Sequence, residues 1–224
     1  IPFLSAYDLA IGVSKTVRDT LSCPNKISIY NGVNWDAERV AVTPPEYEQV
    51  AESQNPVVAA VGRLVPAKGF DLLIAAWESK FGYLFVVGDG PERESLEALV
   101  AARGLAENVF LIGHKDSALD YIGAADLVVI PSRNEGFSYV FAEALLEKTP
   151  VISTDVPIPN EVLPKQYICA IENVEAIHLL LTTALSNVNR LEQSLAPLFD
   201  YAEKNLTLAR SRDQTLAAYE ALIE

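Results

Sequence analysis

Cysteine, histidine and methionine are scarce in this sequence. The 224 residues include two cysteines, two histidines and no methionine. Cys23 and Cys169 lie far apart and outside any Cys-x-x-Cys or Cys/His spacing, which excludes a disulfide scaffold and a zinc knuckle. We therefore expect two reduced thiols that pack as small apolar side chains. The chain opens with Ile1-Pro2-Phe3, so we expect it to be a fragment of a longer protein.

Long apolar runs and an excess of positive charge are also absent. No apolar run reaches the ~18–20 residues that a membrane-spanning helix needs, and no secretory signal opens the chain. Lys plus Arg number 17 against 30 Asp plus Glu, a formal net charge of −13. Such a field repels nucleic acid and anionic lipid, so an anionic ligand needs a local cluster of cations. We expect a cytoplasmic protein that binds no nucleic acid, with peripheral contact at the inner membrane face left open.

Short apolar runs of strand type alternate with helix-period segments along most of the chain. Hydrophobic residues make up 50% of the sequence and charged residues 21%, which suffices for a sizeable core. The alternation indicates βα units and a parallel sheet. Runs such as Val57–Val61 and Leu127–Ile130 are apolar throughout, as in sheets covered on both faces. The sequence therefore predicts a doubly wound α/β domain from about Asn34, preceded by the last strand and helix of another domain.

The expected elements place three loops at one edge of that sheet. The expected strands are Tyr7–Val13, Lys26–Tyr30, Val57–Val61, Tyr83–Val87, Val109–Ile112, Leu127–Ile130, Val151–Ser153 and Tyr167–Ile171. The expected helices are Ser14–Ser22, Glu46–Glu52, Phe70–Ser79, one with Pro91 at its first position, Ala118–Ala125, Ser138–Glu147, and a C-terminal helical region interrupted near 187–190 and at Asn205. Ligands of such sheets bind beyond the carboxyl ends of the strands. That position points to the loops 62–69, 88–90 and 131–137.

The loop Gly62–Gly69 contains two cations and no carboxylate in an otherwise acidic chain. The planar fork of Arg63 matches phosphate oxygens, and Lys68 adds a compact charge. Gly62 and Gly69 permit close backbone approach, and Gly69 precedes a helix whose N-terminus favours an anion. These features predict a phosphate site, and a solvated turn with two surface cations is the alternative.

The segment Glu135–Glu143 carries two acids around a helix start. Gly136, Phe137 and Ser138 should present free backbone N–H groups there. Glu143 lies inside the apolar run Tyr139–Leu146, and a lone buried carboxylate is costly. Glu143 is therefore expected either to face a ligand or to pair with a structural arginine.

Several other sequence motifs for nucleotide or metal binding are incomplete or absent. Gly88-Asp89-Gly90 lacks the third glycine of a dinucleotide fingerprint, because Arg93 occupies that place, and Lys68 is followed by Gly69, which excludes a Walker motif. No Asp-x-Asp pair or His-Glu-x-x-His is present, so the sequence suggests no metal ligands. His178 lies in an apolar helical run, and His114 is expected to edge a ligand cleft mainly through its backbone.

Taken together and in order, these segments resemble a known family. It is the large family of retaining, nucleotide-sugar-dependent glycosyltransferases built from two Rossmann-like domains (family four, group 1), and the similarity is to its donor-binding half. The motifs that carry the resemblance are Ile29–Asn34 (the "NGV" element), Val61–Arg63 with Lys68-Gly69, Val87–Pro91, Phe110–Gly113, Ala125-Asp126, Pro131-Ser132, Glu135-x7-Glu143 and Thr149–Ile152.

The resemblance implies a role for each site residue. Arg63 and Lys68 would hold the donor diphosphate and stabilise the leaving nucleotide, next to the close backbone at Gly62. Glu135 would bind sugar hydroxyls, supported by the amides of Gly136, Phe137 and Ser138. Glu143 would bind the ribose hydroxyls, and the backbone around His114 would edge the base. The reaction would be metal-independent, without a cofactor, and would proceed through an oxocarbenium-like transition state, with no covalent nucleophile assigned.

The resemblance also implies a domain organisation and a biological role. Residues 1–33 would be the remnant of an N-terminal acceptor domain and its connection, and residues 34–224 the nucleotide-sugar-binding domain with C-terminal helices. The expected protein is a retaining hexosyltransferase that uses a UDP-, GDP- or ADP-linked sugar and a glycan or lipid-linked acceptor, in polysaccharide or lipopolysaccharide synthesis. The isolated chain would bind donor weakly and transfer nothing.

Two other readings of the same residues stay open. One is a non-catalytic nucleotide-sugar-binding or interaction domain of the same fold, and the other is a phosphosugar isomerase or epimerase. The glycine-free stretch Asp155–Glu161 also departs from the family pattern, so that loop is expected to have a different shape.

Overall fold

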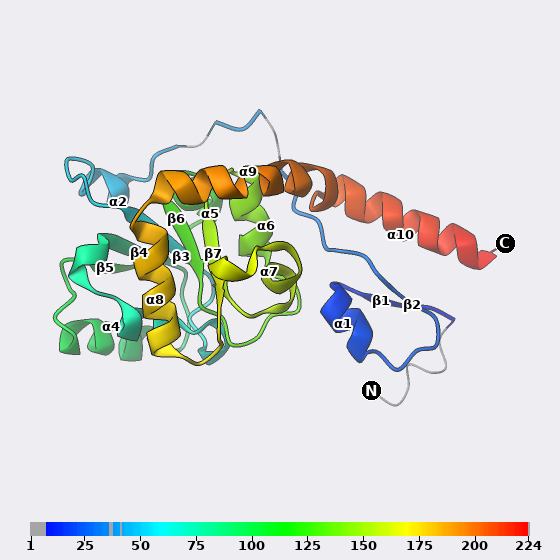
Figure 1. Ribbon diagram of the computed structural model, residues 1–224, viewed down its shortest axis with the longest axis horizontal. Coiled ribbons are helices and arrows are strands. Elements are labelled where there is room, and N and C mark those ends of the chain that lie inside the picture. The colour runs from blue at the N-terminus through cyan, green and yellow to red at the C-terminus, as the bar shows by residue number, and fades with distance from the viewer. Residues whose placement is uncertain (1–7, 36–37, 41, 224) are drawn as a thin grey trace.

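The computed structural model describes residues 8–35, 38–40 and 42–223, which form two separate parallel sheets. The larger sheet has six strands in the order β5-β4-β3-β6-β7-β8 (Figure 1). The chain therefore builds outward from β3 to β5, then crosses back to β6 and builds in the opposite direction. The strands are β3 (Val57–Val61), β4 (Tyr83–Val87), β5 (Val109–Gly113), β6 (Leu127–Ile130), β7 (Val151–Thr154) and β8 (Ile168–Cys169).

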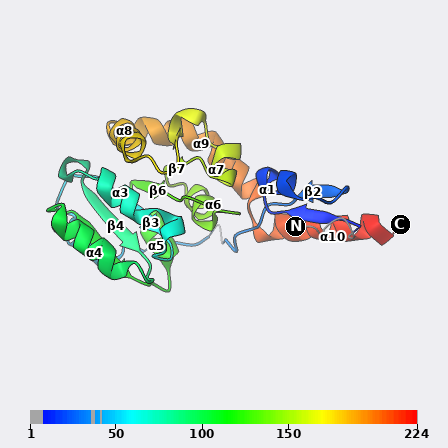
Figure 2. The ribbon, with the colours of Figure 1, turned by 90° about the horizontal axis from the view of Figure 1, so that it is seen from below.

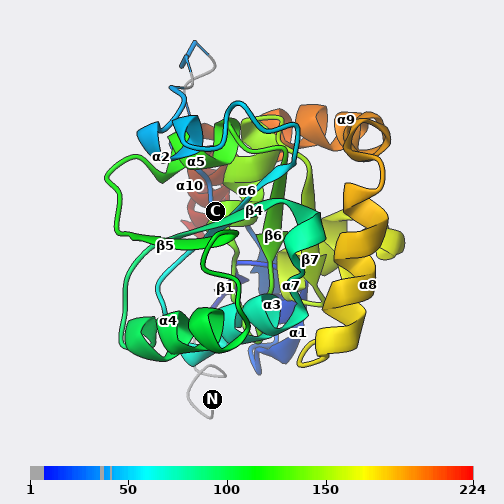
Figure 3. The same cartoon turned by 90° about the vertical axis from the view of Figure 1, so that its left-hand side faces the viewer.

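Helices cover both faces of this sheet. α3, α4 and α8 pack together on one face, and α5, α6 and α9 on the other (Figure 3). The helices are α2 (Pro45–Glu48), α3 (Phe70–Ala76), α4 (Arg93–Ala102), α5 (Ala118–Gly123), α6 (Tyr139–Leu146), α7 (Pro157–Val162), α8 (Val174–Leu185) and α9 (Val188–Asn205). We call residues 45–205 the sheet domain. The prediction of a doubly wound, Rossmann-like α/β fold is confirmed.

The core of the sheet domain lies between these layers. Val58, Ala59 and Ala60 of β3 are fully buried, and so are Phe141 of α6 and Trp77 after α3. Complete burial on both faces explains why the apolar runs show no alternation with polar residues.

A second, smaller unit precedes the sheet domain in sequence. β1 (Ala10–Gly12) and β2 (Lys26–Ser28) pair in parallel around α1 (Lys15–Thr20), and we call residues 10–28 the βαβ unit. Figures 1 and 2 show α10 (Leu208–Ile223) leaving the sheet domain and running beside this unit. Backbone hydrogen bonds of 2.9 Å join Val33 to Leu206 and Leu208, where the chain enters and leaves the sheet domain.

One carboxylate of the sheet domain joins the βαβ unit to it. Glu161 of α7 accepts hydrogen bonds from the backbone N–H of Lys15 (3.2 Å) and of Thr16 (2.7 Å), at the start of α1. The hydroxyls of Thr16 and Tyr30 also donate to it, each at 2.8 Å. Partial burial acts to raise the pKa of Glu161, but these hydrogen bonds outweigh it and hold the pKa below its usual range. Glu161 thus supplies acceptors to amides that the first turn of α1 leaves free.

Several expected boundaries differ from the structure. The first expected strand is reduced to Ala10–Gly12, and Tyr7 lies outside the described residues. The helix expected over Phe70–Ser79 ends at Ala76, because Trp77 adopts an extended conformation. Pro91 does not begin a helix, since α4 starts at Arg93 after Glu92. Shorter elements replace the expected Lys26–Tyr30, Glu46–Glu52 and Tyr167–Ile171.

The segment after β7 contains a helix that the sequence reading missed. α7 spans Pro157–Val162, with Pro157 at the start of the helix. Proline is accepted in a first helical turn, where its missing N–H would have no intrahelical partner. The stretch Asp155–Glu161, expected to be a loop, thus contains most of a short helix, and its expected difference from the family pattern stays a prediction. In the part of the chain that the structure describes, no helix combines the length and apolar character needed to cross a bilayer.

Candidate functional site

Two glycines bring the ends of β3 and β4 together. The strands pair in register up to Val61 and Val87, and the Gly62 N–H donates to the carbonyl oxygen of Val87 at 2.9 Å. Gly88 has φ +142°, and a Cβ at this position would lie 1.9 Å from the carbonyl oxygen of Gly62. A side chain at Gly88 is therefore excluded, and bare backbone forms this edge of the sheet.

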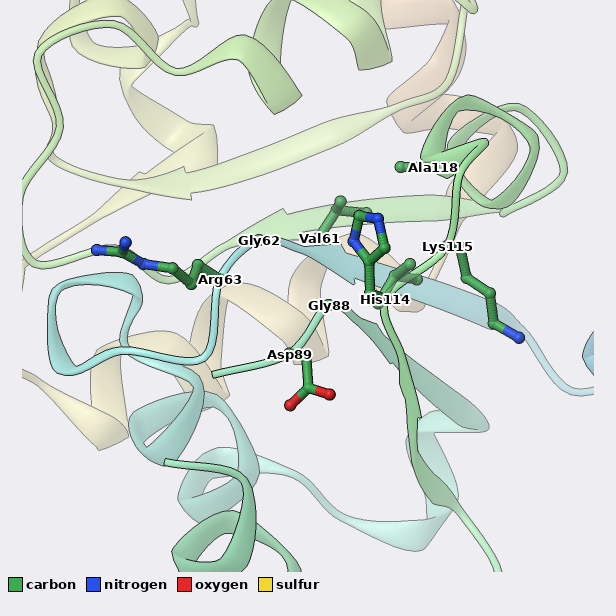
Figure 4. Close-up of a pocket in the computed structure, with 9 residues that line it drawn as sticks. Val61, Gly62, Arg63, Gly88, Asp89, His114, Lys115 and Ala118 are labelled. Carbon is green, nitrogen blue, oxygen red and sulfur yellow. The ribbon is translucent and has the colours of Figure 1, made fainter. Parts of the chain in front are cut away.

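A cavity of about 450 Å³ opens beyond these strand ends (Figure 4). This volume lies within the ~300–1,000 Å³ of small-molecule sites. Three residues predicted for the site, Gly62, Arg63 and His114, line it. The other lining residues are Val61, Val87, Gly88, Asp89, Lys115 and Ala118. The cavity therefore combines apolar strand ends with a small number of polar groups.

The cations at this cavity have different partners. Lys115 forms an ion pair with Glu46 of α2, which also accepts a 2.6 Å hydrogen bond from the Tyr121 hydroxyl. Arg63 is exposed, and within the described residues its guanidinium has no hydrogen bond or ion pair. Figure 4 shows the side chains of Arg63 and Lys115 extending in opposite directions. Arg63 is therefore the cation at the cavity that is available to a ligand.

Lys68 and Glu135 meet beside the cavity. Lys68 Nζ lies 2.6 Å from Glu135 Oε1, which also accepts a 2.8 Å hydrogen bond from Ser132 Oγ. A Cβ built at Gly62 would come 3.5 Å from Cδ and Cε of Lys68, so the lysine stem lies against the cavity edge. Both donors use the same carboxylate oxygen, which leaves Oε2 of Glu135 free of partners among the described residues.

Unused hydrogen-bond donors gather at the start of α6. Within the described ranges, the backbone N–H groups of Gly136, Phe137 and Ser138 have no acceptor. Ser138 is the N-cap residue, yet its side chain makes no cap hydrogen bond, and its buried Oγ has no partner among the residues described. The Phe137 ring is buried, so this residue offers only its backbone to the site. The helix N-terminus and these donors form a place suited to an anion.

Glu143 lies further along α6 and does not line the cavity. Burial raises the pKa of its carboxyl above the usual range, and the nearby Glu147 carboxylate adds to the shift. The structural arginine that the sequence left open as a partner is not seen beside the Glu143 carboxylate among the described residues, and Arg39 pairs with the neighbouring Glu147 at 2.6 Å. Among described residues, the side-chain carboxylate of Glu143 has no hydrogen bond and no ion pair. The ion pair with a structural arginine is therefore not formed among the described residues, and a role of Glu143 toward a ligand stays a prediction.

The structure thus brings together some predicted residues and separates others. Gly62, Arg63 and His114 share a cavity, Lys68 meets Glu135 at its edge, and 136–138 form the adjoining helix start. Their roles in binding stay predictions. Six residues that line the cavity were not among the predicted site residues: Val61, Val87, Gly88, Asp89, Lys115 and Ala118. Gly88 and Asp89 lie in the loop 88–90, which the sequence did place at the ligand-binding edge without assigning a role to either residue.

The described residues contain no group of three or more His, Cys, Asp or Glu side chains arranged to hold a metal ion. His114 has a 77% exposed side chain, 3.9 Å from Asp116, and His178 contacts Glu78 away from the cavity.

Comparison with known proteins decides the family. The model of the family "Glycosyl transferases group 1" matches residues 45–196, more than half of the chain. The chain belongs to the group 1 glycosyl transferases.

Two relatives of this group 1 glycosyltransferase are named for lipopolysaccharide core biosynthesis and O-antigen biosynthesis. Its chain is 33% identical over 144 residues to the lipopolysaccharide core biosynthesis glycosyltransferase LpsE of Rhizobium meliloti, covering 64% of this chain and 42% of the relative. It is 30% identical over 145 residues to the O-antigen biosynthesis glycosyltransferase WclY of Escherichia coli, covering 64% and 41%. The aligned part thus spans about two fifths of the length of these relatives.

Solved glycosyltransferases share the fold over nearly the whole chain. The Rickettsia africae glycosyltransferase has a TM-score of 0.82 at 19% identity, covering 96% of this chain and 63% of that one. Anabaena Alr3699/HepE, solved in complex with UDP, has a TM-score of 0.82 at 20% identity, covering 95% and 64%. At these identities the likeness establishes the fold of this group 1 glycosyltransferase and nothing finer.

Proposed function

We propose that this chain is the nucleotide-sugar-binding part of a retaining hexosyltransferase that builds lipopolysaccharide or a related surface polysaccharide. The donor would be a sugar linked to UDP, GDP or ADP, and the acceptor a glycan or a lipid-linked glycan. The relatives LpsE and WclY support the polysaccharide role, and the structures of HepE with UDP and UDP-glucose make UDP the first nucleotide to test.

One observation carries the proposal: unused groups suited to a diphosphate surround one edge of the sheet. The guanidinium of Arg63 lacks a partner among the described residues, and so do the N–H groups at the start of α6 and the buried Ser138 Oγ. In a chain of net charge −13, these groups form the local positive site that an anionic ligand requires.

In the proposed reaction, charge develops on the oxygen that leaves with the nucleotide. Arg63 and Lys68 would stabilise that charge, together with the amide dipoles at the start of α6. Lys68 has three N–H donors, and Glu135 accepts one of them, so the others can reach a phosphate. The free Oε2 of Glu135 would accept a sugar hydroxyl, and Glu143 would accept ribose hydroxyls.

These groups would supply leaving-group stabilisation without a metal ion. The transition state would be oxocarbenium-like, as in other glycosyl transfer, and we assign no covalent nucleophile. Removal of divalent metal with EDTA should then leave nucleotide affinity unchanged, and a tenfold or greater loss would argue against metal independence.

We further propose that the βαβ unit belongs to an acceptor-binding domain. Its sheet is separate from that of the sheet domain, and Val13 lies against Gly136 at the start of α6, 3.8 Å from a Cβ built there. The acceptor would then approach the donor sugar from this side. The chain alone would bind nucleotide weakly and show no transfer, and measurable turnover by the 224 residues would contradict this.

Calorimetric titration with UDP, GDP and ADP tests the proposal. Charged hydrogen bonds contribute ~1.5–3 kcal/mol each, so Arg63→Ala combined with Lys68→Ala should weaken the preferred nucleotide diphosphate at least tenfold. The matched control is Lys80→Ala combined with Arg212→Ala, which removes the same charge from exposed positions outside the cavity. If wild type binds none of the three nucleotides, the proposal fails and a non-catalytic interaction domain is favoured.

A further inference from the structure

Arg133 connects the two loops that carry Lys68 and Glu135. It lies between β6 and α6, two residues before Glu135. Its Nη1 donates to the carbonyl oxygen of Pro66 at 2.7 Å, and its backbone N–H donates to that of Ala67 at 2.8 Å. Arg133 therefore holds the segment immediately before Lys68.

The same guanidinium is held from two other elements. Asp71, in the first turn of α3, accepts two parallel hydrogen bonds of 2.7 Å from Nη1 and Nη2. Glu172, after β8, accepts a 2.8 Å hydrogen bond from Nε. The Arg133 guanidinium keeps the pKa of Asp71 below its usual range. A bidentate arginine–carboxylate pair fixes orientation as well as distance.

Little of Arg133 remains for a ligand. Nε donates once, Nη1 twice and Nη2 once, so four of its five N–H groups are already used. The loops it joins also touch through backbone: Gly69 has φ +68°, and a Cβ there would lie 2.1 Å from the carbonyl oxygen of Pro131. The loops thus meet at a backbone contact and at the Arg133 network, and the Lys68–Glu135 pair lies beside both.

We propose that Arg133 is a positioning residue of the donor site, which holds Lys68 where it can reach the diphosphate of the donor. The inference rests on the function proposed above. Arg133 also offsets one of the two negative charges of Asp71 and Glu172, whose carboxylates would otherwise repel a diphosphate from the loop 62–69 more strongly. Loss of Arg133 therefore weakens binding of the β-phosphate of the nucleoside diphosphate in two ways. Lys68 is no longer held in place, and the carboxylates of Asp71 and Glu172 lose their partner.

The test compares a nucleoside diphosphate with its monophosphate. Calorimetry is performed with the nucleotide pair that wild type binds best, for example UDP and UMP. If wild type prefers the diphosphate by tenfold or more, Arg133→Met should reduce that preference to about twofold or less and leave monophosphate affinity within about twofold. A purely structural role would weaken both nucleotides together. Arg133→Lys, which keeps the charge but not the fork, should recover only part of the preference.

Two further variants keep the test decisive. Glu172→Gln alters an exposed partner of the same arginine and should retain the preference, because the bidentate pair with Asp71 remains. Asp71→Asn keeps the arginine and should lose part of the preference, and it replaces Arg133→Met if thermal unfolding shows that variant to be unfolded. The inference is overturned if Arg133→Met or Asp71→Asn keeps the full diphosphate preference while Lys68→Ala loses it. If wild type binds no nucleotide, the proposed function fails first, and this inference with it.

Discussion

The sheet domain and the βαβ unit are held by different forces. The six-stranded sheet is buried on both faces, with strand residues such as Val58 and Ala59 that expose no surface. The βαβ unit has two strands, its helix α1 buries none of the residues Lys15–Thr20, and Ile11 and Ile27 are exposed. Hydrogen bonds from the βαβ unit to Glu161 join the two. Apolar burial is the main stabilising interaction of the sheet domain, whereas the side-chain hydrogen bonds of the junction converge on one carboxylate whose charge state varies with pH.

The largest expected effect is in the sheet domain. Phe141 is fully buried on α6, and its replacement by alanine should lower the free energy of unfolding by ~3–5 kcal/mol, since a large cavity remains. Urea titration followed by circular dichroism measures this loss. The control is Tyr219→Ala, in which the aromatic ring is 60% exposed on α10, and it should change stability by no more than ~0.5 kcal/mol. Equal losses in the two variants would mean that the sheet core is not the main source of stability.

A substitution at the junction between the βαβ unit and the sheet domain should have a smaller effect, confined to the residues that contact Glu161. Glu161→Gln removes a charged acceptor, so the amides of Lys15 and Thr16 should exchange hydrogen about tenfold faster. Amides of β3 should be unaffected, because the sheet core does not involve Glu161. Exchange measured by NMR reports both regions in one experiment. Glu107→Gln, at an exposed position before β5, should change neither, and faster exchange throughout the sheet domain would contradict a local role.

The smallest expected effect concerns the pH dependence of stability. Glu161 and Glu143 should change the free energy of unfolding in opposite directions when the pH falls. The pKa of Glu161 is lowered in the folded protein, so its stabilisation is present above the unfolded value near 4.5 and is lost as pH falls through the lowered pKa. The pKa of Glu143 is raised by burial and by Glu147. The stabilisation that comes from its protonated, neutral form is therefore fully present below 4.5 and is lost as the pH rises through the raised pKa. A lower pH should therefore weaken the hydrogen bonds to Glu161 at the junction, and it should remove the cost of a buried negative charge at Glu143.

Unfolding measured from pH 7 to pH 4 separates these contributions. The stability difference between Glu143→Gln and wild type should favour the variant near pH 7 and shrink as the pH falls. Exchange at Lys15 and Thr16 should rise at low pH in wild type and be independent of pH in Glu161→Gln, after correction for intrinsic rates. Parallel curves for Glu143→Gln and wild type would show that Glu143 does not titrate abnormally.

Much of the sheet domain could be predicted because its signals are local. The expected strands Val57–Val61, Tyr83–Val87 and Leu127–Ile130 have the bounds seen in the structure, since uninterrupted apolar runs flanked by glycine or polar residues define them. Helix ends were less predictable, as at Trp77, where packing and not propensity ends α3. α7 was missed because the stretch 155–161 was treated as a loop by comparison with the family pattern.

The site could be predicted only where a motif marks a strand end. Gly62, Arg63 and His114 follow strands directly, and they line the cavity. The network of Arg133 depends on Asp71, 62 residues away, and on Glu172, 39 residues away, so nothing local indicates it. The same holds for Lys115, whose partner Glu46 is 69 residues away on α2. Pairings of this kind are decided by topology, which brings distant loops to one edge of the sheet.

The close contacts of Gly88 with Gly62, and of Gly69 with Pro131, have an evolutionary consequence. Because backbone contacts set the spacing of the loops, the neighbouring side chains are not needed to maintain it. They can therefore be substituted during evolution without changing the position of the loops. Under the function proposed above, positions such as His114 and Ala118 at the cavity wall would then be free to change toward a different donor while the loops that bind the phosphates keep their spacing. A lineage built on this scaffold would, on the same proposal, change which sugar nucleotide it accepts through a few replacements at the cavity wall.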